Sequence, residues 1–180
     1  MKYQFFIIVT LLVAAVFLAG CTEEDLSPIT ETLSAEPPLP GQALVLVGDV
    51  TGDGLAGGTI DTIDFTVSLV PGARPIDMEK ISIVYADTIK TESLIPVESY
   101  WGDPPMGCWG ILNVVDQIGD QNNRIEDKER FVIRLNPRAY LPANRMVVIV
   151  IRAPDVATPL TIRRFAPAEI AAQGNLLTPA

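Results

Sequence analysis

Apolar and polar residues alternate in several short runs of this chain, and this period of two constrains the fold more than any other feature. In the clearest run, Ile63, Phe65, Val67 and Leu69 are separated by single polar residues, which is typical of a β-strand with one face in a core. Comparable alternation recurs at 81–85, 131–135 and 160–162, and further strands are predicted at 92–97 and 109–115. The run 43–47 is apolar and predicts a short buried strand, and the wholly apolar run 146–151 predicts a strand that is covered on both faces. About eight short strands of this kind predict an all-β fold, an antiparallel β-sandwich with Greek-key connections.

The first 21 residues have the layout of an export signal. Lys2 precedes an almost unbroken apolar run from Phe5 to Ala19, and Gly20 then leads to Cys21. This order predicts a signal peptide that is cut before Cys21, whose thiol would carry a membrane-anchoring lipid. Two alternatives stay open, an uncleaved N-terminal membrane helix and a pilin-like assembly helix. An apolar N-terminal helix is expected in each case.

The chain is therefore divided into three parts. Residues 1–21 form the signal peptide, or the lipid or membrane anchor, and residues 43–180 form the β domain. Between them, residues 22–42 are polar, acidic and rich in proline. Such a segment cannot build a packed core, so we expect a flexible, semi-stiff tether.

Composition excludes several classes of function. The formal net charge of −9 disfavours nucleic acid and anionic lipid headgroups as partners. Histidine, the commonest general base and metal ligand, is absent. After Cys21 the only cysteine is Cys108, so the mature domain has no internal disulfide, and Cys108 is expected to be a small buried apolar group. No catalytic motif is recognisable, and we expect no enzymatic activity.

An acidic stretch between two predicted strands is the best candidate for a binding site. It holds seven side chains with oxygen ligands within a short span, at Asp116, Asp120, Asn122, Asn123, Glu126, Asp127 and Glu129. Bound calcium would relieve the repulsion between these carboxylates, and the expected ligands are Asp116, Asp120, Asn122 and Glu129. The alternative is a solvated acidic loop with Lys128 and Arg130 as counter-ions. No cofactor is required in either case.

A second oxygen-rich run, Asp49–Gly54, partly matches a calcium loop. Position twelve of that loop, however, is Ile60 rather than a bidentate glutamate. A glycine-rich connection with solvated acids is the preferred interpretation.

Aromatic residues flank the Gly- and Pro-rich loop Gly102–Gly110. Tyr100 and Trp101 precede this loop and Trp109 lies within it. Clustered aromatics of this kind either form a contact surface or fold back as a lid over the edge of the sheet.

Three stretches together resemble the outer domain of archaellins, the archaeal flagellins. They are Gly58–Leu69 with the following Pro71–Met78, Gly119–Ile133, and Pro159–Arg164 with Pro167 soon after. The resemblance covers roughly residues 43–180 and implies an immunoglobulin-like β-sandwich that is exposed on a surface filament. The opening differs from that of archaellins, because the apolar run ends at Cys21 and a Pro-rich tether follows it.

This resemblance implies a structural role outside the cell. We expect a subunit or accessory of an archaellum-like filament, which acts by packing against other copies of itself or archaellin-like subunits. The alternative is a lipid-anchored cell-surface module that descends from an archaellin, does not polymerise, and binds the filament, the surface layer or an external ligand. A secreted ligand-binding or enzymatic sandwich would instead require a deep polar cleft.

Overall fold

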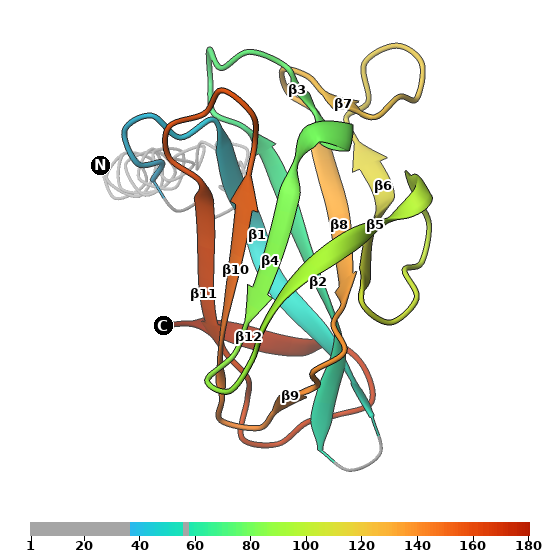
Figure 1. Cartoon of the computed structure of the whole chain (residues 1–180), viewed down its shortest axis with the longest axis vertical. Coiled ribbons are helices and arrows are strands. Elements are labelled where there is room, and N and C mark those ends of the chain that lie inside the picture. The colour runs from blue at the N-terminus through green and yellow to red at the C-terminus, as the bar shows by residue number, and fades with distance from the viewer. Residues whose placement is uncertain (1–36, 56–57) are drawn as a thin grey trace, which may run out of the picture. The chain divides into compact units, whose positions relative to one another are not determined.

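The computed structural model describes residues 37–55 and 58–180, and this part of the chain is built from β-strands with no α-helix (Figure 1). Eight strands coincide with the predicted runs: β1 (Leu44–Leu55), β2 (Thr59–Leu69), β4 (Ser82–Ala86), β5 (Thr91–Trp101), β6 (Cys108–Val115), β8 (Arg130–Asn136), β10 (Met146–Arg152) and β11 (Leu160–Phe165). The other elements are β3 (Ile76–Asp77), the 3-10 helix η1 (Met78–Lys80), β7 (Arg124–Ile125), β9 (Leu141–Pro142) and β12 (Asn175–Pro179). The predicted all-β class is confirmed.

The long strands are joined by hydrogen bonds into a closed circuit. The order is β1-β12-β11-β10-β4-β5-β6-β8-β2, and β2 pairs again with β1. Strand β12 completes the circuit, because Val50 of β1 lies opposite Leu177 and Phe165 of β11 lies opposite Thr178. The short strands β3 and β7 form a separate ribbon next to η1 (Figure 1).

The expectation of a wholly antiparallel arrangement is wrong at one place, where β5 pairs with β6 in parallel. The first part of β5 pairs antiparallel with β4, and the strand then bends. Tyr100 (φ 64°) and Gly102 (φ 106°) both lie in the left-handed region, and the latter donates its N–H to the carbonyl of Ile111 at 2.9 Å. Gly110 allows this close return, since a Cβ there would lie 2.3 Å from the carbonyl oxygen of Gly102.

The alternating residues of the strands supply the core. In β2 the apolar positions are buried and the intervening polar ones are not, as predicted. The largest fully buried side chains are Trp109, Tyr85, Phe65 and Phe131. The Tyr85 hydroxyl and the Trp109 indole N–H have no hydrogen-bond partner in the part of the chain that is described. Burial, and secondarily the charges of Asp87 and Glu92, raise the pKa of Tyr85 above its ordinary value.

Two local expectations from the sequence are wrong. The run Asp49–Gly54 is not a connection, because β1 continues through it by means of a bulge at Gly48 (φ 72°). The apolar residues 146–151 belong to a strand whose sides alternate between buried and half-buried, so that strand is not covered equally on both faces.

The predicted anchor, Cys21 and most of the tether lie outside the described residues. Within 37–55 and 58–180, no helix has the length and hydropathy needed to cross a membrane.

Candidate functional site

The predicted calcium loop connects β6 to β8 at one end of the domain and includes β7, which pairs with β3 next to η1 (Figure 1). Asp116 begins the loop at φ 58°, and its carboxylate forms an ion pair with Arg130 at 2.5 Å. The side-chain oxygen of Asn122 accepts the Arg124 N–H at 2.7 Å, and its amide donates to the carbonyl oxygen of Asp120 at 3.2 Å. These contacts hold the loop in place through its own polar groups.

Glu129 is the buried member of the loop, with only 3% of its surface exposed. One carboxylate oxygen accepts the backbone N–H of Ile118 at 2.8 Å, and the other accepts that of Glu126 at 2.9 Å. The backbone carbonyl of Glu129 also accepts the hydroxyl of Ser68 in β2 at 3.0 Å. Glu129 therefore fastens both ends of the loop, which the sequence pattern does not reveal.

The three predicted carboxylate ligands, Asp116, Asp120 and Glu129, do not form a group that could hold a metal ion. Among residues 37–55 and 58–180, no group of three or more Cys, Asp or Glu side chains is placed to hold a metal ion. Both carboxylate oxygens of Glu129 already have partners within the loop, and the carboxylate of Asp116 is paired with Arg130 of β8. Calcium binding stays a prediction.

Asn123 connects the acidic loop to the aromatic cluster. Its side-chain oxygen accepts the indole N–H of Trp101 at 2.5 Å, and its amide donates to Glu79 at 3.0 Å. Its backbone carbonyl accepts the N–H of Met78 at 2.8 Å. The sequence marks Asn123 only as one of several polar loop residues, because the partners that make it a junction are far away along the chain.

The aromatic residues pack inward, as the lid interpretation predicts. Trp109 is fully buried, and its ring centroid lies 6.1 Å from that of Tyr100. Trp101 lies 6.1 Å from Phe131, measured between centroids, and is half-buried. These contacts favour the lid interpretation over an aromatic contact surface around the loop Gly102–Gly110.

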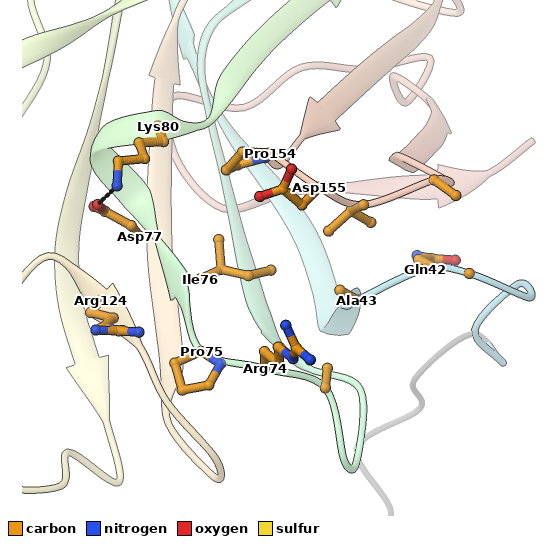
Figure 2. A pocket seen from close by; sticks show the side chains of 14 residues that line it. Gln42, Ala43, Arg74, Pro75, Ile76, Asp77, Lys80, Arg124, Pro154 and Asp155 are labelled. Atoms are coloured by element: carbon orange, nitrogen blue, oxygen red, sulfur yellow. Dashed lines mark ion pairs between the residues drawn. The ribbon is translucent and has the colours of Figure 1, made fainter.

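A cleft of about 650 Å³ opens next to the acidic loop (Figure 2). Its walls are residues 41–43, 73–77 and 154–157 with Lys80 and Arg124. Lys80 forms an ion pair with Asp77 at 3.1 Å, and this hydrogen bond is the main reason that the pKa of Asp77 lies below its ordinary value. No local sequence pattern predicts a polar cleft at this end of the domain, since its walls come from four separate segments.

Elsewhere on the surface, Arg134 connects several strands through contacts with carboxylates. The Arg134 guanidinium donates two hydrogen bonds to Asp64 in β2, at 2.6 and 2.7 Å, and one to Asp103 at 3.1 Å. A third carboxylate, Asp53 of β1, lies 3.5 Å away. These hydrogen bonds, those to Asp64 first, raise the pKa of Arg134. The group stabilises the arrangement of strands and has no free nucleophile beside it.

Comparison with known proteins identifies the class of fold. No family model matches the chain, and no curated protein matches it by sequence. The fold is nevertheless archaellin-like, because it superposes on solved archaellum proteins.

Two solved structures are informative. The crystal structure of archaeal flagellin FlaB1 from Methanocaldococcus jannaschii has a TM-score of 0.58 and 18% identity, covering 76% of this chain and 98% of that one. The archaeal flagellum of Methanospirillum hungatei strain JF1 has a TM-score of 0.52 and 14% identity, covering 97% of each chain. At these identities the likeness concerns the fold.

Proposed function

We propose that this chain is a non-enzymatic structural subunit or accessory of an archaellum-like surface filament. The observation that carries this proposal is the common fold with an archaeal flagellin and with an archaeal flagellum subunit, at TM-scores of 0.58 and 0.52. The second of these covers almost the whole of both chains. Coverage of that extent argues against a shared small motif as the source of the similarity.

The proposed mechanism is lateral packing of the β domain against other subunits on the outside of the cell. We propose an immunoglobulin-like sandwich in which β1, β2, β6 and β8 form one layer and β4, β10 and β11 form the other. The change of pairing partner along β5 and β12 supports this division, since each strand pairs with both groups. Polar outer faces on both layers would then meet neighbouring subunits.

Shearing tests the filament role directly. Filaments are sheared from native cells, purified, and analysed for this chain by mass spectrometry. Recovery in constant proportion to the other filament proteins supports the proposal. Retention of the whole pool in the cell membrane, while filaments are recovered normally, contradicts it.

A lipid-anchored surface module is the second candidate, and the order of residues up to Cys21 favours it. In this case a labelled lipid precursor fed to cells would be incorporated into the protein. Cys21→Ser should abolish the label, whereas Cys108→Ser, at the other cysteine, should retain it. Partners would then be the membrane through the anchor and, on the outside, the filament or the surface layer. Absence of label in the unaltered chain argues against this candidate.

Calcium at Asp116, Asp120, Asn122 and Glu129 is retained as a proposal with its own test. A bound ion stabilises the folded state by mass action, so a chelator should lower the melting temperature and added calcium should restore it. An unchanged melting temperature would contradict calcium binding without affecting the proposed structural role.

A further inference from the structure

The cleft beside the acidic loop presents two arginines whose guanidinium groups have no hydrogen-bond or ion-pair partner in the described part of the chain. Arg74 and Arg124 lie on the same wall, on either side of Pro75 (Figure 2). Neither guanidinium makes a hydrogen bond or ion pair with any residue in the described part of the chain. The third cation, Lys80, is held by Asp77. In a chain of net charge −9, this cleft is lined by three cations, Arg74, Lys80 and Arg124, and by two carboxylates, Asp77 and Asp155.

The backbone keeps these two arginines near one another. Arg124 belongs to β7 and is the direct neighbour of Asp77 in the β3–β7 pair. Arg74 precedes Asp77 by three residues, or about 10 Å of extended chain. The ribbon places Arg124, and Arg74 lies on the segment that leads into β3. Both residues line the same cleft, so one ligand that fills the cleft can meet both.

The rest of the wall shows what kind of ligand would fit. Ile76, Pro154 and Val156 contribute apolar surface, and Asp155 lies across the cleft with its backbone at φ 58°. A guanidinium recognises a carboxylate through two parallel hydrogen bonds. The apolar surface between the charged groups favours a ligand that carries short apolar side chains over a uniformly charged polymer.

Size separates a peptide from a simple anion. A water molecule occupies about 30 Å³ in the liquid, and small-molecule sites in proteins span about 300–1,000 Å³. The cleft, at about 650 Å³, would be left mostly unfilled by a single inorganic anion. An anionic membrane is also disfavoured, because the arginines line a concavity and the whole chain is acidic.

We propose that this cleft binds a carboxylate-bearing extended segment of a neighbouring protein subunit. Arg74 and Arg124 would hold a carboxylate, while Ile76 and Val156 would contact apolar side chains beside it. The inference rests on the proposed structural role, to which it adds a particular docking surface and the chemistry of the segment that occupies it.

The experiment uses the full chain and a pair of synthetic peptides. One peptide alternates glutamate with valine over about six residues, and the other has glutamine at each glutamate position. We expect the acidic peptide to bind at least about ten-fold more tightly at low ionic strength, with the difference shrinking as salt screens the charges. Arg74→Gln and Arg124→Gln should each weaken its binding about five- to ten-fold.

The matched control is Arg145→Gln. Arg145 is also an exposed arginine without a side-chain partner among the described residues, but it precedes β10, whereas the cleft lies beyond the other end of that strand. Its substitution should leave peptide binding unchanged, and the melting temperatures of all three variants should match that of the unaltered chain. Equal weakening by all three substitutions would show that attraction is non-specific and overturn the proposal.

Two further arms distinguish the other occupants. Complete displacement of the peptide by inorganic phosphate at the same concentration would reveal a simple anion site and overturn the peptide proposal. Binding of phosphatidylglycerol vesicles that depends on Arg74, without peptide binding, would reveal a membrane surface instead. If the chain is recovered in sheared filaments but binds no acidic peptide, the docking inference alone fails. If the peptide binds and no filaments contain the chain, the structural role alone fails.

Discussion

Replacing Glu129 by glutamine tests whether this buried carboxylate fastens the acidic loop. In the folded protein its two oxygens accept the N–H groups of Ile118 and Glu126, at 2.8 and 2.9 Å. Glutamine has the same shape but only one acceptor oxygen. Its amide group would face one of the two N–H groups as a donor, so that this N–H loses its partner inside the protein.

The expected cost follows from the two contacts. A hydrogen bond to a charged group contributes about 1.5–3 kcal/mol, and an unsatisfied buried donor carries its own penalty of about 1–3 kcal/mol. Since one hydrogen bond is lost and the other loses its charge, we expect Glu129→Gln to lower the free energy of unfolding by about 2–4 kcal/mol. For a domain of this size that is a fall of about 6–16 °C in melting temperature.

Thermal and denaturant unfolding measure this effect, and Glu126→Gln is the matched control. The side chain of Glu126 makes no hydrogen bond or ion pair within the described residues, while its backbone N–H, which the substitution preserves, donates to Glu129. The control should change stability by less than about 0.5 kcal/mol. If the two variants unfold together, the fastening role of Glu129 is refuted. A loss that occurs only when calcium is present would instead favour Glu129 as a metal ligand.

Three other substitutions test the energetics of the domain. Tyr85→Phe should be neutral or slightly stabilising in chemical denaturation at pH 7, because the buried hydroxyl has no partner in the described structure. Since burial, with nearby carboxylates, raises the pKa of Tyr85, the unaltered chain should lose stability as the pH rises above about 10, and the phenylalanine variant should lose less. Arg134→Lys should lower the free energy of unfolding by about 1–2 kcal/mol in urea titration, since an ammonium cannot reproduce the paired hydrogen bonds to Asp64. An unchanged midpoint would mean that these hydrogen bonds contribute nothing to stability. Asp77→Asn should cost at most about 1 kcal/mol at neutral pH, because its ion pair with Lys80 is largely exposed. The pKa of Asp77 is lowered in the folded state, so this cost should vanish as the pH falls below about 4 and the carboxylate is protonated; a cost that persists in acid would contradict the ion pair as its source.

Periodicity predicts most of the fold because burial on one face of a sheet leaves a direct trace in the sequence. The run ending at Leu69 and its counterparts all become strands. Strand β12 was not predicted, since Asn175–Pro179 is short and carries a proline. Its place is set by hydrogen bonds to β1 and β11 on either side, and these are long-range pairings that no local pattern records.

The candidate site was predictable in composition but not in geometry. The acidic loop was found from its residue types, yet the fastening role of Glu129 depends on which backbone N–H groups its two oxygens meet. The cleft is not predictable from local patterns, because its arginines, Arg74 and Arg124, are fifty positions apart and line the same cleft only in the folded chain. The net charge of the whole chain does not show that positive side chains gather in this cleft.

Closure of the strand circuit has a consequence for how the protein matures. The pair that completes it joins β1, near the start of the domain, to β12, near residue 180. During synthesis, β1 must therefore remain without this neighbour until residues 175–179 have been made. The entropy of closing so long a loop delays that step further. Until then the edge of β1 that pairs with β12 is exposed. At that stage the incomplete domain is open to proteolysis and to premature association with other chains.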